Sequence, residues 1–170
     1  MTQPLLETER LILRPLKRSD AGLIALYTGD SRVAKMTESI PHPLPPGSTE
    51  AFIDSVLTGV RPETVWAIDH KGSAAEELIG VIGLGETGTV GYWLGAPFWH
   101  TGFATEAVEA VVAHALATHD RLRAEVFQDN LASARVLTKA GFGYIGEAES
   151  YCVARGAMVP VWRYEFTAAG

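Results

Sequence analysis

The residues best suited to chemistry lie where a hydrophobic strand pattern, ending at Tyr92–Gly95, passes through a short turn into an amphipathic helix pattern that begins at Gly102. The first backbone N–H groups of such a helix have no partner within the helix, and the helix dipole adds positive potential. Gly102 lets the backbone approach a ligand closely because glycine has no Cβ, and Ala104 keeps the helix start uncluttered. The junction is therefore typical of a site for a phosphate-bearing cofactor.

Alternating and helical patterns place this junction within a mixed α/β chain. Strands are predicted at residues 10–14, 64–68, 78–84, 90–94, 122–126, near 142–154 and near 158–166, and helices after Ser19–Asp20, from Gly47 or Ser48, from Gly102 to about Leu116, and from Asn130 to Gly141. The order is β-α-α-β-β-β-α-β-α-β-β over one domain, residues 1–170. The helical crossover makes the strands of Tyr92 and Leu122 parallel neighbours, and ligands in such sheets bind beyond the carboxyl ends of the strands.

Composition limits the class of protein. The 170 residues include 14 Lys+Arg and 20 Asp+Glu, a net charge of −6, which disfavours a general nucleic-acid role and slightly favours a cationic partner. The single cysteine, Cys152, excludes an internal disulfide framework and a cysteine zinc site, as expected for a reducing cytoplasm. No metal site is expected from the spacing of His114 and His119, no apolar run is long enough to span a membrane, and no signal peptide is apparent.

Four segments, taken in order, resemble the GCN5-related N-acetyltransferase (GNAT) family and, within it, the RimJ/RimL-type branch. They are Arg10–Leu16, Ile79–Leu84 with Val90–Leu94, Gly102–Ala107, and Asn130–Ser133 through Gly141–Phe142. No single motif is decisive, but the four occur in the order of the family over nearly the whole chain. The resemblance implies the GNAT acyl-CoA N-acyltransferase fold, with the pyrophosphate of acetyl-CoA at the Gly102 junction.

The resemblance also implies which residues bind the cofactor. They are Leu94, Gly95, Trp99, His100, Thr101, Gly102, Phe103, Ala104, Thr105, Asn130 and Ser133. The N–H groups near Leu94 and Gly95 are expected to stabilise the thioester oxygen as it gains charge. Trp99 and His100 depart from the family, which usually has Arg or Gln at position 99 and often Gly at position 100. Trp99 is expected to pack on the adenine side or on a neighbour, and His100 to offer a donor to a phosphate when protonated.

Acetyl transfer also needs groups that donate and accept protons. The resemblance places Asn130 and Ser133 near the reacting sulfur, so that Ser133 is the candidate to assist the leaving thiol. The alternative is a purely structural helix start, capped by Asn130 with Ser133 in its first turn. Glu125 is the candidate general base and Glu86 is a second candidate, with a solvated carboxylate as the alternative for each. Ordered water is a route that requires no named base. His42, in the loop at residues 41–46, is expected either to border the acceptor groove or to be a solvated loop residue.

Together these expectations describe an acetyl-CoA-dependent N-acetyltransferase that acts on a primary amine by direct attack in a ternary complex, without an acyl-enzyme. The branch resemblance suggests a protein N-terminus as acceptor, and a small-molecule amine is an equal alternative. The oligomeric state is open, although homodimers are common in the resembled family, and neither nucleic acid nor a membrane is an expected partner. The alternative from another functional class is a non-catalytic acyl-CoA-binding module, motivated by Trp99 and His100.

Overall fold

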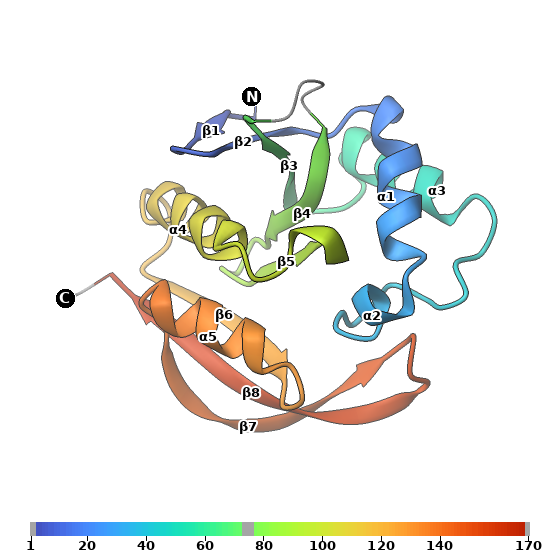
Figure 1. Cartoon of the computed structure of the whole chain (residues 1–170). Coiled ribbons are helices and arrows are strands. Elements are labelled where there is room, and N and C mark those ends of the chain that lie inside the picture. The colour runs from blue at the N-terminus through green and yellow to red at the C-terminus, as the bar shows by residue number, and fades with distance from the viewer. Residues whose placement is uncertain (1–2, 73–76, 169–170) are drawn as a thin grey trace.

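The computed structural model describes residues 3–72 and 77–168, which form two sheets with helices packed beside them (Figure 1). The first sheet has the order β1–β2–β3–β4–β5, and the second has the order β6–β8–β7. The strands are β1 (Leu6–Glu7), β2 (Leu11–Pro15), β3 (Thr64–His70), β4 (Leu78–Leu84), β5 (Val90–Leu94), β6 (Arg121–Phe127), β7 (Gly143–Cys152) and β8 (Ala157–Thr167). The helices are α1 (Ala21–Thr28), α2 (Ser31–Ala34), α3 (Ser48–Leu57), α4 (Phe103–Ala115) and α5 (Leu131–Lys139). The predicted mixed fold is confirmed, with β1 and α2 as additions too short to produce a periodic pattern.

The predicted parallel pairing of the strands of Tyr92 and Leu122 is wrong over most of its length. Among the described residues, β5 and β6 approach through a parallel bridge between Thr89 and Arg123, where the Arg123 N–H donates to the Gly88 carbonyl at 2.9 Å. Beyond the bridge the two strands belong to different sheets, and Figure 1 shows them apart. The carboxyl-terminal halves of β5 and β6 therefore keep sheet edges that are not paired with each other.

Alternation along β5 divides its side chains between two cores. Val90, Tyr92 and Leu94 pack in a cluster with side chains of α4, whereas Trp93 packs with side chains of α1 and α3 on the opposite face of the sheet. Within α4, Val108 and Val111 are completely buried, and each contributes about 1.5–3 kcal/mol of burial free energy. The predicted amphipathic helix is confirmed, and its burial holds the strand–turn–helix junction in place.

The start of α1 differs from the prediction. The Asp20 side chain does not cap the helix, because its carboxylate accepts two hydrogen bonds from the Arg14 guanidinium, at 2.8 and 3.0 Å. Within α1, Leu26 is 65% exposed, whereas Ile24 and Thr28 are buried. Arg14 also binds Asp69 at 2.6 Å, so that this largely buried charge cluster joins β2, β3 and the start of α1. The predicted turn Lys71-Gly72-Ser73 falls partly outside the described residues.

Candidate active site

A cavity of about 1160 Å³ lies between the diverging strands β5 and β6. Helices α4 and α5 form one wall, which we call the cofactor wall, and α1–α3 with residues 36–41 and 44 form the acceptor wall. The cavity brings together most of the residues predicted for the site: Leu94, Trp99, His100, Thr101, Gly102, Ala104, Thr105, Glu125, Asn130 and Ser133. Gly95 and Phe103 do not line it.

The unpaired edge of β5 directs backbone donors toward this cavity. The Gly95 N–H donates to the Ile79 carbonyl at 2.8 Å, and Leu94 stands opposite Gly80, so hydrogen bonds to β4 alternate along β5. The N–H groups of Tyr92 and Leu94 consequently point away from β4. The expectation of a free Gly95 N–H is wrong, since the sheet uses it, whereas the Leu94 N–H has the orientation that an oxyanion donor needs.

The turn before α4 has backbone geometry suited to an anion. Gly102, the N-cap of α4, has a φ of +83°, and His100 has a φ of +62°, so both adopt the left-handed conformation. The Thr101 hydroxyl fixes the turn by donating to the Phe98 carbonyl at 2.6 Å. Helix α4 is 13 residues long and begins at Phe103. The N–H groups of its first turn, which includes Ala104, have no partner within the helix. The main chain of this turn can therefore hold an anion.

Arg10, which sequence reasoning did not place at the site, braces this turn from the side of β2. Its Nη1 donates to the Thr101 carbonyl at 3.0 Å, and its Nε donates to Glu106 at 2.8 Å. Burial alone would raise the pKa of Glu106, but hydrogen bonds from Thr8 and Arg10 outweigh that effect and lower it. The Phe103 ring lies in the core beneath the Arg10 guanidinium, 4.5 Å from ring centroid to guanidinium, so its side chain is structural rather than part of the cavity.

The two positions that depart from the family have different surroundings. Trp99 turns inward, where its Nε1 donates to the Leu94 carbonyl at 2.9 Å and its ring packs against the core. The Arg32 guanidinium of α2 lies 5.7 Å from the Trp99 ring, so this side chain connects the two walls. Of the two expectations for Trp99, packing on a neighbour is the one observed. His100 is exposed and lines the cavity.

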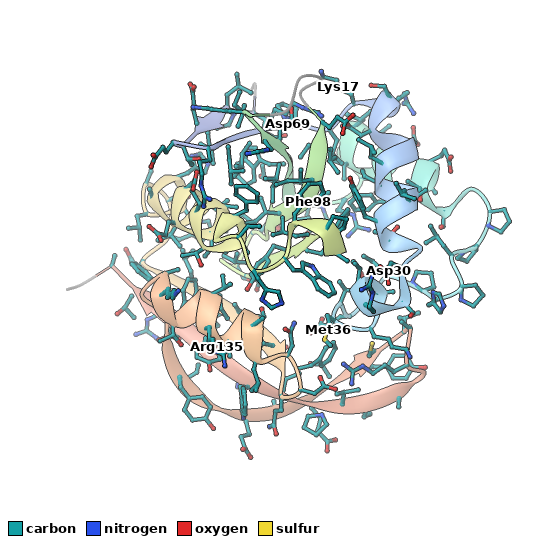
Figure 2. All side chains as sticks on the ribbon, in the orientation of Figure 1. Lys17, Asp30, Met36, Asp69, Phe98 and Arg135 are labelled. Carbon is teal, nitrogen blue, oxygen red and sulfur yellow. The ribbon has the colours of Figure 1, made fainter. Side chains whose placement is uncertain are left out.

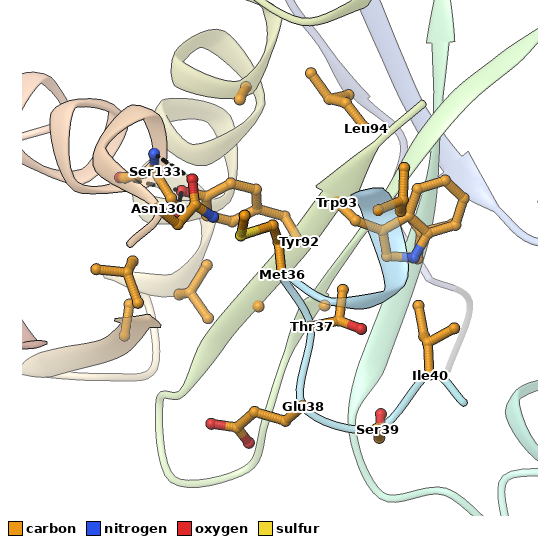
Figure 3. A pocket seen from close by; sticks show the side chains of 18 of the residues that line it. Met36, Thr37, Glu38, Ser39, Ile40, Tyr92, Trp93, Leu94, Asn130 and Ser133 are labelled. Atoms are coloured by element: carbon orange, nitrogen blue, oxygen red, sulfur yellow. Dashed lines mark hydrogen bonds between the residues drawn. The ribbon is translucent and has the colours of Figure 1, made fainter. Parts of the chain in front are cut away.

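Helix α5 begins beside β5 with the arrangement predicted for its cap. The Asn130 side chain accepts a hydrogen bond from the Ser133 N–H at 3.2 Å. The Ser133 hydroxyl lies 2.6 Å from the hydroxyl of Tyr92, which points toward it from β5, whereas Trp93 points the other way (Figure 3). Burial raises the pKa of Tyr92 to about 12, so its phenol keeps its proton at neutral pH. Asn130 is thus a cap, and Ser133 has a buried donor beside it that sequence reasoning missed.

Two cations on α5 were also missed. Arg135 and Lys139 both line the cavity, and Lys139 lines a small adjoining depression together with Gly102 and Thr105. Figure 2 shows Arg135 on α5 and Met36 across from it, on the segment that follows α2. The spacing of four residues was the available signal, since residues i and i+4 share one face of a helix. Lys139 therefore places one positive charge beside the start of α4, in a depression that Glu9, Glu106 and Glu109 also line.

The acceptor wall is anchored by the end of the β7–β8 hairpin. The Cys152 thiol donates to the Thr37 carbonyl at 3.2 Å, and Arg155 Nε donates to the Lys35 carbonyl at 2.9 Å. Cys152 is completely buried, an environment in which a thiol is inert. Figure 3 shows the anchored segment, Met36–Ile40, in front of Tyr92 and Trp93.

Carboxylates reach the cavity from β6 and from the acceptor wall. The Glu125 carboxylate, on β6, accepts from the Ser150 hydroxyl at 3.2 Å and lies 3.7 Å from Arg163 Nε. Glu86 does not line the cavity, so its expected place over the acceptor site is wrong; its backbone carbonyl lies 2.9 Å from His119 Nε2 at the other end of α4. Glu38, which sequence reasoning did not single out, lines the cavity from the acceptor wall.

Other groups considered from the sequence lie elsewhere. His42 is not among the lining residues, although its neighbours Pro41 and Leu44 are. Within residues 3–72 and 77–168, no group of three or more His, Cys, Asp or Glu side chains is placed to hold a metal ion. No helix in that part of the chain is long and apolar enough to cross a membrane.

Comparisons with known proteins agree with this geometry. The RimL alpha-N-acetyltransferase of a ribosomal protein, solved with coenzyme A, has a TM-score of 0.82 and 16% identity, covering 96% of this chain and 98% of that one. The microcin self-immunity acetyltransferase MccE, solved with acetyl-CoA and AMP, has a TM-score of 0.80 and 17% identity, covering 94% and 93%. Both show the same fold.

Sequence comparison shows the family. The Bacillus subtilis (strain 168) protein called Uncharacterized N-acetyltransferase YoaA is 32% identical over 166 residues, which cover 90% of each chain. The family model described as the acetyltransferase (GNAT) domain matches residues 10–143. The match includes β5, the turn before α4 and the capped start of α5. Because the model and this relative both cover most of the chain, the chain belongs to the GNAT acetyltransferase family.

Proposed function

We propose that this protein is an acetyl-CoA-dependent N-acetyltransferase of the RimJ/RimL type, which acetylates a primary amine by direct attack in a ternary complex. The observation that carries the proposal is the cavity between β5 and β6, which has the N-terminus of α4 at one end and the Tyr92–Ser133 pair on its cofactor wall. RimL and MccE, which share this fold, are acetyltransferases solved with coenzyme A or acetyl-CoA.

The residues of the cofactor wall fit the chemistry of acetyl-CoA. The pyrophosphate suits the main-chain N–H groups at the start of α4, where Gly102 leaves room for close approach. Arg135 and Lys139, which line the same cavity, would offer positive charge to the phosphates of acetyl-CoA. The outward N–H groups of β5 suit the amide groups of the pantetheine arm, which would add to the strand edge as a peptide does.

The site also fits the needs of acetyl transfer, for which acetyl-CoA supplies the activated acyl group. The Leu94 N–H is oriented to polarise the thioester oxygen as negative charge develops on it. The Ser133 hydroxyl is placed to protonate the departing sulfur. Tyr92, whose pKa of about 12 keeps its phenol protonated at neutral pH, is placed to restore the Ser133 proton. Glu125 remains the proposed base from the sequence, held by Ser150 and Arg163.

The acceptor class follows from charge rather than from shape. The net charge of −6 and the carboxylates on both sides of the cavity favour an amine that arrives as a cation. A protein N-terminus and a small polyamine both meet this requirement. The relationship to RimL favours the N-terminus, and the relationship to MccE keeps the small acceptor in the test.

An assay of thiol release tests the proposal. Purified protein is mixed with acetyl-CoA and with either spermidine or a hexapeptide that has a free N-terminal alanine, and the free CoA thiol and the acetylated product are measured. We expect amine-dependent thiol release and a rise in Tm on saturation with CoA. CoA binding without thiol release for any amine would favour the non-catalytic module, and no rise in Tm would refute the cofactor site.

A further inference from the structure

Two carboxylates meet across the acceptor end of the cavity. Glu125 lines it from β6, and Glu38 lines it from the segment that follows α2. Glu38 interacts electrostatically with Glu125 and with Ser150, and the Ser150 hydroxyl donates to Glu125 at 3.2 Å. Figure 3 shows the Glu38 carboxylate turned toward the side of the cavity from which α5 approaches. The two carboxylates repel one another, which favours a proton or a cation beside them.

The strand register shows what this pair faces. The bridge joins Thr89 to Arg123, so Gly91 and Glu125, each two residues further along parallel strands, lie at the same level. Gly91 shares the face of β5 that carries Trp93, and Glu125 lies on the face of β6 opposite the buried Ala124. A Cβ on Gly91 would meet nothing within 4 Å. Open space therefore lies beside the β5 edge, level with Glu125 and on the acceptor side.

Contacts between distant parts of the chain fix the position of Glu38. Its carbonyl accepts the Val153 N–H at 2.9 Å, and the carbonyl of the preceding Thr37 accepts the Cys152 thiol at 3.2 Å. Ser150 belongs to the same strand, β7, as Cys152. One hairpin thus fixes the backbone of Glu38 and carries the hydroxyl that binds Glu125, so the fold brings two exposed carboxylates to the same part of the cavity.

The net charge of this carboxylate pair suits one ammonium group. Arg163, 3.7 Å from Glu125, matches one of the two negative charges. Two further cations near this end of the cavity are already paired, namely Arg61 with Glu63 at 2.7 Å and Arg155 with Asp129 at 2.7 Å. One negative charge is therefore left for a ligand. Burial and the charge of Glu125 raise the pKa of Glu38, while hydrogen bonding from Ser150 opposes the rise.

We infer that Glu38 and Glu125 form one proton-accepting pair that binds the ammonium group of the acceptor and takes its proton. This inference rests on the proposed function. One proton passes from the ammonium group to the Glu38 carboxylate, and the nitrogen lone pair then forms the bond to the acetyl carbon. The carbon–sulfur bond breaks, and a second proton from the nitrogen reaches the sulfur through the Ser133 hydroxyl. Glu38 finally releases its proton to solvent, so the cycle yields the amide, the free thiol and one proton.

An NMR titration tests the pair independently of catalysis. The carboxyl carbons of glutamate are labelled with ¹³C, and the Glu38 signal is identified by its loss in Glu38→Gln. We expect the Glu38 carboxyl to titrate above the ordinary pKa of a glutamate side chain. Glu149, an exposed glutamate one residue from Ser150 along β7, is the matched control position. The variant Glu125→Gln should lower the Glu38 midpoint, because it removes the neighbouring negative charge. A Glu38 midpoint that is unchanged in Glu125→Gln would overturn the pair.

Kinetics test the role of the pair with the acceptor that the thiol-release assay selects. Glu38→Gln should lower kcat about 100-fold and remove the acidic limb of the pH profile of kcat/KM, whereas CoA affinity stays unchanged. Glu38→Asp should restore part of the rate, and Glu149→Gln, with the same change of charge, should match the wild type. Equal kinetics for Glu38→Gln and Glu149→Gln would refute the inference.

Stability separates a catalytic role from a structural one. A carboxyl whose pKa is raised by folding favours the folded state below its unfolded pKa and loses that contribution as pH rises through the folded pKa. At pH 7 the ionised Glu38 is therefore a burden, and Glu38→Gln should unfold at the same or a higher Tm than the wild type. A slow variant with a reduced Tm would contradict the catalytic role. If the wild type shows no turnover with any amine, but the Glu38 midpoint still shifts in Glu125→Gln, only the proposed function is refuted.

Discussion

The cofactor wall and the acceptor wall of the cavity are built by different means. On the cofactor wall several of the defining contacts are local: Asn130 caps the N–H of Ser133, Trp99 binds the carbonyl of Leu94, and the N-terminus of α4 follows directly from its turn. Arg10 and Tyr92 support this wall from other parts of the chain. On the acceptor wall they join distant residues, as between Cys152 and Thr37 or between Arg155 and Lys35. A local feature such as a helix cap or a turn depends on a few neighbouring residues and can be recognised in a sequence. The acceptor wall depends on the whole fold.

The difference predicts different sensitivities to mutation. The cofactor wall relies on main-chain groups, which side-chain changes leave in place unless they block the site or alter the backbone. The acceptor wall relies on individual side chains that hold a segment without regular structure. Mutations in the first wall should therefore affect CoA affinity or the chemical step, and mutations in the second should affect the acceptor.

The largest effect is expected from Gly102→Glu. The new side chain would meet Arg10 Nη2 at 3.1 Å from its Cβ, would strain a φ of +83°, and would bring a carboxylate to the place proposed for the pyrophosphate. We expect CoA affinity, measured by calorimetry, to fall at least 100-fold, which is about 3 kcal/mol. Gly22→Glu, at an open position of α1, is the control. Retained affinity in a folded Gly102→Glu protein would remove the proposed site from α4.

A smaller effect is expected from Ser133→Ala. If Ser133 protonates the sulfur, kcat should fall about 100-fold while CoA affinity stays within twofold, because the cap uses the Ser133 N–H rather than its hydroxyl. Tyr92→Phe should show a weaker form of the same loss, since only the relay behind Ser133 is removed. Thr138→Ala, which deletes an exposed hydroxyl from the same helix, serves as the comparison in steady-state kinetics. Wild-type kcat in Ser133→Ala would leave Ser133 as a helix-start residue.

Arg155→Met tests the acceptor wall. It removes the hydrogen bond to the Lys35 carbonyl and the ion pair with Asp129. We expect KM for the acceptor to rise about tenfold and CoA affinity to remain unchanged, with a stability loss of about 1–2 kcal/mol in denaturant unfolding. Arg18→Met, which breaks an exposed ion pair with Asp54, should change neither KM nor stability measurably. A parallel loss of CoA affinity in Arg155→Met would show that the two walls are not separable.

The smallest effect is expected from His100→Gly. A non-glycine residue at a φ of +62° carries about 1 kcal/mol of backbone strain, which glycine relieves at the cost of greater freedom in the unfolded chain. The free energy of unfolding should rise by less than about 1 kcal/mol, as measured by urea denaturation. CoA affinity should change little if the main chain holds the phosphates; a tenfold loss would assign a direct phosphate contact to the imidazole.

Prediction from sequence succeeded where a signal is short-range. The strand at β4, the helix that begins after Gly102 and the cap at Asn130 each depend on residues within a few positions of one another, and the structure has them. Prediction failed where long-range pairing decides: Gly95 donates to Ile79, Glu86 lies away from the cavity, and β5 separates from β6. Spacing also carried an unused signal, since Arg135 and Lys139 share a helix face.

The sequence by itself determined the family, the order of the elements and the strand–turn–helix device, because hydrophobic periodicity, glycine and helix caps act between near neighbours. Only the tertiary structure decided where β5 and β6 part, which N–H groups stay unpaired, and which carboxylates meet. Glu38 and Glu125 lie far apart in the chain, and their approach depends on a hairpin near its end. Long-range contacts of this kind depend on the packing of the whole chain, which no local pattern records.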